Sequence, residues 1–79
     1  MTIRVKLFAI AKDQAGTGET TVDVPDGSSV STAVSELERR FPKLTTTSFA
    51  TAVNRAYAPR DSVLQSNDEL ALIPPVSGG

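Results

Sequence analysis

One amphipathic helix constrains the fold of this 79-residue chain more than any other feature. The segment 30–41, VSTAVSELERRF, places its apolar side chains three and four residues apart, on one stripe of a helix. These side chains belong to Val30, Ala33, Val34, Leu37 and Phe41. Ser28 or Ser29 can cap the start of the helix, and Pro42 ends it. Because the chain is small, this helix must cover one face of a sheet.

The amino-terminal half of the chain predicts a hairpin. The segment 2–11, TIRVKLFAIA, alternates between inward apolar positions and outward positions, and it leaves Phe8 as an outward aromatic. Its inward residues are Ile3, Val5, Leu7 and Ala9. A turn in which Gly16 and Gly18 can take positive φ then leads to a second strand, TTVDV, at 20–24.

The segments after the helix are shorter and less regular. PKLTTTSFA is expected to be a loop in which Leu44 and Phe49 turn inward, and TAVNRAY at 51–57 is expected to be a third strand. A brief apolar contact is expected at Val63 and Leu64. The turn that follows contains Asn67, a residue type that tolerates the left-handed conformation.

The last strand, ELALIP at 69–74, is almost continuously apolar, as expected of a strand covered on at least one face. The first and last strands are the richest in apolar residues, so we expect them to be neighbours at the centre of the sheet. The predicted class is α+β, with the β-grasp arrangement of ubiquitin: a mixed sheet packed against one main helix. We expect residues 1–79 to form a single domain, with 74–79 as an extended, protruding carboxyl-terminal tail.

Composition excludes several kinds of chemistry. The chain has no cysteine and no histidine, which removes disulfides, thiolate metal sites, the commonest general base and most zinc sites. We therefore expect no metal site and a reducing, cytoplasmic location. The net charge of -1 favours neither nucleic acid nor a membrane surface, and no apolar run approaches the roughly 20 residues of a membrane span. Proteins are the expected partners.

Two further patterns are interpreted as surface and turn residues. GTG at 16–18 has no third glycine and opens no helix, so it predicts a turn and not a phosphate-binding loop. The acidic pairs Glu36 with Glu38 and Asp68 with Glu69 fit a helix surface and a turn better than acid–base catalysis. Any use of ATP is therefore expected to belong to another protein.

The carboxyl-terminal segment PPVSGG, at 74–79, is the strongest candidate for function, although a frayed chain end is the alternative. Pro74 and Pro75 have a preset φ and cannot donate to a ladder, so they predict a stiff exit from the sheet. Gly78 and Gly79 lack a Cβ and can pass through a channel too narrow for a side chain. The terminal carboxylate is charged at pH 7 and is a poor electrophile, so a partner must activate it.

Four segments carry a resemblance to a known family: PPVSGG, the preceding NDELALI, AVN at 52–54 and the opening IRVKLFAIAKDQAG. Across nearly the whole chain they resemble the MoaD branch of the MoaD/ThiS family, the ubiquitin-like small subunits of molybdopterin synthase. The resemblance implies that a ubiquitin-activating-type adenylyltransferase, MoeB-like, uses ATP to adenylate the terminal glycine. Sulfur from a donor protein then converts it to a thiocarboxylate.

The resemblance also implies an acceptor and a role for each tail residue. The tail enters a MoaE-like large subunit, in an assembly of two small and two large subunits, and gives its sulfur to cyclic pyranopterin monophosphate. Gly79 carries the adenylate and the thiocarboxylate, and Gly78 allows passage. The channel is lined by Pro74, Pro75, Val76 and Ser77. The chain alone binds no cofactor.

Two positions outside the tail match the family by alignment. Phe8 falls where the family has an exposed aromatic that meets partners, and an aromatic packed under its own loop is the alternative. Lys12 falls where a basic residue lies near the strand's end, with a solvated lysine as the alternative. Asn67 stands where glycine is usual, which changes the backbone only mildly.

Other functions would use the same terminal glycine. A thiamin-pathway carrier of the ThiS type keeps the sulfur chemistry, but its end lacks the double proline, which favours the molybdopterin pathway. A protein modifier, like the archaeal small ubiquitin-like modifiers or the ubiquitin-related modifier, would join its glycine to target lysines. A ubiquitin-like binding module with an inert tail is the remaining alternative.

Overall fold

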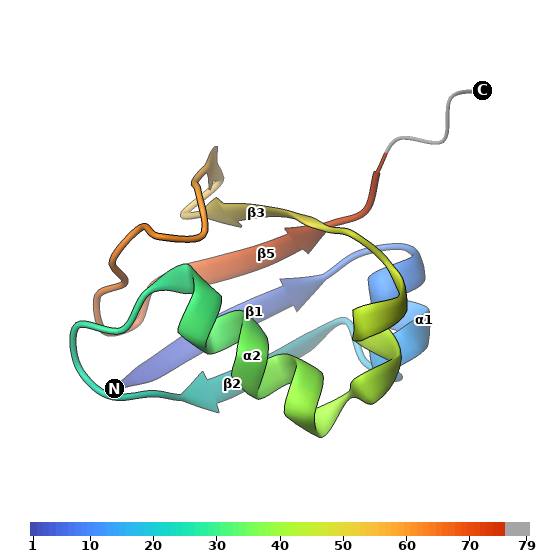
Figure 1. The fold of residues 1–79 in the computed structure, drawn as a ribbon, viewed down its shortest axis with the longest axis horizontal. Helices are drawn as coiled ribbons and strands as arrows, with labels where there is room; N and C mark the ends of the chain where they lie inside the picture. The colour runs from blue at the N-terminus through green and yellow to red at the C-terminus, as the bar shows by residue number, and fades with distance from the viewer. Residues whose placement is uncertain (76–79) are drawn as a thin grey trace.

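The computed structural model of the protein describes residues 1–75. A five-stranded mixed sheet forms one of its two layers. The strands are β1 (Thr2–Leu7), β2 (Glu19–Asp23), β3 (Ala50–Val53), β4 (Ala56–Tyr57) and β5 (Glu69–Ile73). Their order is β2-β1-β5-β3-β4; β1 and β5 are parallel, and the other neighbours are antiparallel. The first and last strands are therefore the central neighbours that the sequence predicts (Figure 1).

The second layer is the helix α2 (Val30–Arg40), which lies across one face of the sheet (Figure 1). It buries the predicted stripe through Leu37, and Phe41 follows as a partly buried residue. Ser29 is the cap: its hydroxyl oxygen accepts a hydrogen bond from the Thr32 amide at 3.4 Å. The 3₁₀ helix η1 (Pro42–Thr46) follows directly. The order of elements and these two layers confirm the predicted α+β class.

The core lies between α2 and the inner face of the sheet. Its largest fully buried side chains are Ile3, Val5, Leu7, Val30, Leu37, Leu44, Leu64, Leu70 and Leu72. They come from both central strands, the helix and the connecting loops, so all of these segments share one apolar cluster.

The prediction for the end of the first strand was wrong. β1 ends at Leu7, and residues Ile10–Ala15 form a helix, α1, where the sequence predicted strand and turn. Ala9 is exposed, not inward. Alanine, lysine and glutamine are good helix formers. The apolar alternation of the strand continues past Leu7 through Ala9 and Ala11, which fit either a strand or a helix, so the sequence did not show where the strand ends. Gly16, at φ 77°, ends α1 with its amide bonded to the Lys12 carbonyl at 2.8 Å.

Other details also differ from the sequence predictions. β1 and β2 do pair as a hairpin, but α1 connects them. Gly18 does not take positive φ, whereas Asn67, at φ 69°, does as predicted. Val63 is exposed and pairs with Ser29 in an isolated bridge, while the neighbouring Leu64 is buried as expected.

The segment 51–57 is two short strands and not one. Asn54 and Arg55, at φ 50° and 70°, form the two-residue turn between β3 and β4. A two-residue hairpin turn of this kind needs positive φ at both central positions, and asparagine is one of the few residue types that adopt it readily. The β-branched and aromatic residues on either side concealed this turn in the sequence.

The edge strands are short or covered. The Arg40 guanidinium on α2 donates to the Thr21 carbonyl at 2.6 Å and to the Thr20 hydroxyl at 3.1 Å, both on β2. At the other edge, β4 is only two residues long. Such features limit pairing between sheets of different molecules.

Candidate functional site

The site begins where the central strand β5 ends. Because β1 and β5 are parallel, with Leu7 opposite Leu72, the carboxyl ends of both strands lie at the same end of the sheet (Figure 1). Ile73 is the last strand residue, and Pro74 has no amide hydrogen with which to extend the ladder. Pro74 is half-buried and Pro75 is exposed. The structure thus places these two predicted residues at the exit of the chain from the sheet.

The other predicted tail residues, Val76, Ser77, Gly78 and Gly79, lie outside the described residues. Their roles stay predictions. So does the assignment of residues 1–79 to one domain with a protruding tail.

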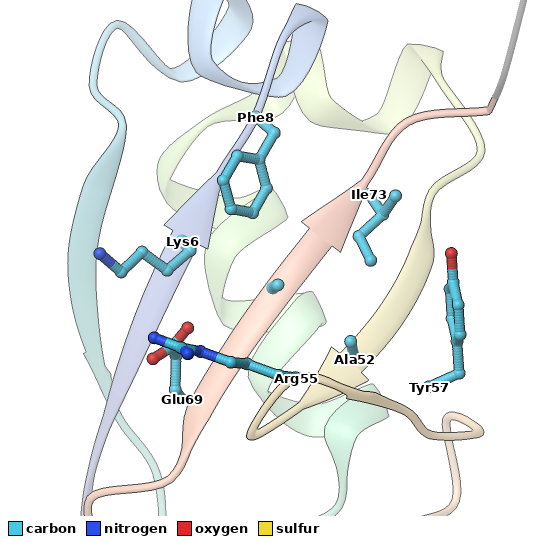
Figure 2. Close-up of a pocket in the computed structure, with 8 residues that line it drawn as sticks. Lys6, Phe8, Ala52, Arg55, Tyr57, Glu69 and Ile73 are labelled. Carbon is cyan, nitrogen blue, oxygen red and sulfur yellow. The ribbon is translucent and has the colours of Figure 1, made fainter.

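A groove lies beside this exit, on the sheet face opposite α2 (Figure 2). The strand register places one row of residues across four strands: Lys6, Ala71, Ala52 and Tyr57. The two alanines form a low floor between larger neighbours. The groove has a volume of about 510 Å³ and is lined by Lys6, Phe8, Ala52, Arg55, Tyr57, Glu69, Ala71 and Ile73.

Phe8 is part of this groove. Its side chain is 50% exposed, so it is not packed under its own loop, and Figure 2 shows it above the sheet beside Ile73. Phe8 is exposed as the sequence predicts, although it follows the end of β1. Its contact with partner proteins remains a prediction.

Lys12 is not part of the groove. It is exposed on α1, and its Cδ and Cε atoms lie 3.5 Å from the position that a Cβ on Gly18 would occupy. The side chain therefore lies along the turn before β2, a position that fits a solvated lysine. Its predicted role with partners is not tested by this placement.

Arg55 and Tyr57 both line the groove, although the sequence alone did not indicate them. Tyr57 is 77% exposed, the most exposed large apolar side chain of residues 1–75. Both residues were hidden by the interpretation of 51–57 as one strand. The signal that could have found them is Asn54, a turn former flanked by two strand-like segments.

Asn54 fixes the turn against the start of β5. Its amide donates to the Glu69 carbonyl at 2.8 Å, and the Glu69 amide donates to its side-chain oxygen at 3.0 Å. The Asn54 side-chain nitrogen also donates to the Asp68 carboxylate at 3.1 Å. These three bonds hold one end of the groove in place.

An ion pair between Lys6 and Glu19 lies at another side of the groove. The hydrogen bond and charge of Lys6 lower the pKa of Glu19 below its ordinary value. A carboxyl pKa that is lower in the folded chain stabilises the fold above the unfolded pKa, and this stabilisation is lost as pH falls through the folded pKa. Both side chains are at least partly exposed, so the effect on stability is expected to be small.

We expect Lys6→Gln to return the pKa of Glu19 toward its ordinary value. The measurement is a carboxyl titration followed by nuclear magnetic resonance. Lys43→Gln, which removes a lysine on η1 instead, is the control and should leave Glu19 unchanged. An unaltered Glu19 titration in Lys6→Gln would contradict the assigned pairing.

Ala9 has a strained backbone between two exposed apolar residues. Its φ and ψ are 49° and -124°, a region that favours glycine, while Phe8 is 50% and Ile10 is 44% exposed. The turn is closed by the Ala11 amide, which donates to the Phe8 carbonyl at 3.0 Å. A strained residue thus lies between two exposed apolar side chains, of which Phe8 lines the groove together with Ile73.

Replacing Ala9 with glycine is expected to raise the free energy of unfolding by about 1 kcal/mol, because the relief of strain exceeds the entropy that glycine loses. Urea denaturation measures the change. The matched control is Ala15→Gly at the end of α1, where glycine has no strain to relieve and should lower stability. Equal effects of the two substitutions would show that Ala9 is not strained.

Neither metal ligands nor a membrane span is found among residues 1–75. No three histidine, cysteine, aspartate or glutamate side chains in this part of the chain gather as a metal site requires. Within the same residues no helix combines the length and the apolar character needed to cross a membrane.

The strand order, the parallel central pair and the single covering helix define a ubiquitin-like β-grasp protein. The fold is similar to that of small archaeal modifier protein 1 from Haloferax volcanii, with a TM-score of 0.91 and 30% identity in a comparison that covers 100% of both chains. The ThiS family model matches residues 5–79, and the chain belongs to this family.

Two curated relatives are similar over almost the full length. The first, the molybdopterin synthase sulfur carrier subunit of Arabidopsis thaliana, is 38% identical and matches 98% of this chain and 82% of its own. The protein of the same name from Dictyostelium discoideum is 37% identical, with 96% of this chain and 94% of its own covered. These findings confirm the predicted resemblance.

Proposed function

We propose that the chain is the sulfur carrier subunit of a molybdopterin synthase. The observation that carries the proposal is its similarity, at 38% and 37% identity, to two relatives that bear this name. The geometry supports it, because the central strand β5 ends at Ile73 and leads directly to Pro74, where the chain leaves the sheet. The groove beside Pro74 provides a surface that a partner can bind while it acts on the carboxyl terminus.

In the proposed reaction, the Gly79 carboxylate attacks the α-phosphate of ATP in a partner adenylyltransferase. Pyrophosphate leaves and an acyl adenylate forms. The persulfide of a donor protein then displaces AMP and forms an acyl disulfide. A thiol of the donor attacks the S–S bond of this intermediate, which releases the Gly79 thiocarboxylate and leaves a disulfide on the donor. ATP belongs to the partner, and this chain supplies the carboxyl group and the slender segment that carries it.

The large subunit then receives the tail and accepts the sulfur on cyclic pyranopterin monophosphate. In this scheme Gly78 permits passage, and Pro74, Pro75, Val76 and Ser77 line the channel. The partners are a MoaE-like large subunit, a MoeB-like adenylyltransferase and a sulfur donor. We expect two small and two large subunits to assemble in the cytoplasm.

The test is mass spectrometry of the chain produced together with its activating enzyme and a sulfur donor. We expect a mass change that matches exchange of one oxygen for sulfur, located at Gly79 by fragmentation. A known carrier treated in parallel shows that the enzymes are active. An unmodified chain beside a modified control carrier would contradict the proposal.

A protein modifier is the second candidate, favoured by the similarity to small archaeal modifier protein 1. In that function the activated Gly79 would form an amide with lysines of target proteins. Lysine-linked conjugates in a lysate, with no stable complex with a large synthase subunit, would support this candidate. A free thiocarboxylate and such a complex support the carrier.

A further inference from the structure

A second groove lies at the edge of the sheet, between the start of β3 and the segment that follows β4. This segment continues along β3, because the Ala58 amide donates to the Thr51 carbonyl at 3.0 Å. The edge groove has a volume of about 410 Å³, and its lining includes Phe49, Tyr57, Pro59 and Arg60. Its walls are thus mainly apolar, with one guanidinium beside them.

The guanidinium of Arg60 has donors to spare. It donates to the Phe49 carbonyl at 3.4 Å, which is its one side-chain hydrogen bond within residues 1–75. No ion pair among these residues includes Arg60, and its sequence neighbour Asp61 is not paired with it. A guanidinium has five N–H donors and binds a carboxylate through two parallel hydrogen bonds. Arg60 can therefore bind a carboxylate and keep its bond to Phe49.

The carboxyl-terminal segment of the same chain can reach this groove. Ala50 is opposite Ile73, so the start of β3 lies beside the end of β5 (Figure 1). Neighbouring strands are about 4.8 Å apart, so a groove one strand beyond β3 lies about 10 Å from β5. The four residues 76–79 span about 13–14 Å when extended. The segment is thus long enough to cross β3 and end beside Arg60.

The composition of residues 76–79 is complementary to the edge groove. Val76 is aliphatic, and Gly78 and Gly79 can adopt the backbone angles that a reversal of direction needs. In the proposed function the segment ends in a carboxylate, which is charged at pH 7. Arg55 is a less suitable cation, because it follows the far end of β3 and is more distant from the exit of the tail.

We propose that residues 76–79 fold back over the start of β3 and bind in the edge groove, with the Gly79 carboxylate on Arg60. The proposal rests on the proposed function, in which Gly79 is the last residue. A docked tail cannot enter the active site of a partner, so the contact is autoinhibitory. The apparent affinity of a partner for the tail then falls with the fraction of tails that are released. Exposed ion pairs are weak, so a partner can displace the docked tail.

The first test measures the heteronuclear NOE of the Gly78 and Gly79 amides in the free, full-length chain by nuclear magnetic resonance. We expect Arg60→Gln to lower these values, because a released tail moves faster. Arg60→Lys keeps the charge and should give intermediate values. The matched control, Arg55→Gln, removes a guanidinium from the other groove and should leave the tail as it is in the wild type.

A chain in which Gly79 ends in a carboxamide tests the ion pair from the other side. This change should shift the amide signals of Ala58 and Asp61 in the wild type and leave them unchanged in the Arg60→Gln chain. Unchanged signals in both chains would overturn the proposal. Shifts confined to Phe8 and Ala71 would overturn it too, because they would place the tail on the open face.

The second test measures adenylation by the activating enzyme at chain concentrations below the KM. Arg60→Gln should be adenylated about two- to threefold faster than the wild type, because more of its tails are released. Arg39→Gln makes the same change on α2 and should react as the wild type does. A rate of Arg60→Gln at or below that of the wild type would overturn the autoinhibitory role. If no variant were adenylated, the proposed function would fail, and the resonance measurements would still decide whether the tail docks.

Discussion

A chain that carries one additional alanine after Gly79 is expected to lose sulfur transfer completely while it folds as the wild type does. In the proposed function the reacting group is the carboxylate of Gly79. In the extended chain this group is an amide, and the new terminal carboxylate lies one residue farther along the tail. The added residue also gives the tip a Cβ that the glycine pair lacks. Mass spectrometry after incubation with the activating enzyme and ATP measures the loss.

The control carries the same extra alanine after Ser48, an exposed residue between η1 and β3, and keeps Gly79 at the end. It should fold and accept sulfur, because exposed loops tolerate insertions. Thiocarboxylate formation by the extended chain, without prior trimming, would show that the terminal carboxyl group is not the site.

Leu70→Ala is expected to lower the free energy of unfolding by about 2–5 kcal/mol. Leu70 is fully buried on β5, opposite Val5 of β1 and Val53 of β3, so its loss opens a cavity at the centre of the core. A loss of this size is a large fraction of the stability of a small domain. The variant should therefore unfold at much lower urea concentration than the wild type.

Val63→Ala is the matched control, because it also shortens an aliphatic side chain but at a site that is 67% exposed. Its effect should stay within about 0.5 kcal/mol. If both variants had equal midpoints in urea, β5 would not be central to the core.

The parts of the fold that depend on long, regular patterns were predicted correctly. The stripe of α2, its cap at Ser29 and the central position of β1 and β5 all follow from apolar spacing and composition. Short segments were less predictable. At Ala9 and at Asn54 and Arg55 the chain adopts positive φ without glycine at any of these positions, so the usual sequence signal for such turns was lacking.

The candidate site was predictable only in part. The tail could be recognised because its prolines and glycines have local physical meaning. The groove could not, because its row of Lys6, Ala71, Ala52 and Tyr57 is made by the register of four strands that are distant in the sequence. Arg55 lines the groove only because the β3–β4 turn is bonded beside the start of β5.

The short β4 edge and the cover that Arg40 gives β2 have a consequence for how this molecule can associate. Copies of the chain have little free backbone at either side of the sheet with which to form a continuous ribbon. At high concentration we therefore expect the molecules to remain separate and not to join strand to strand.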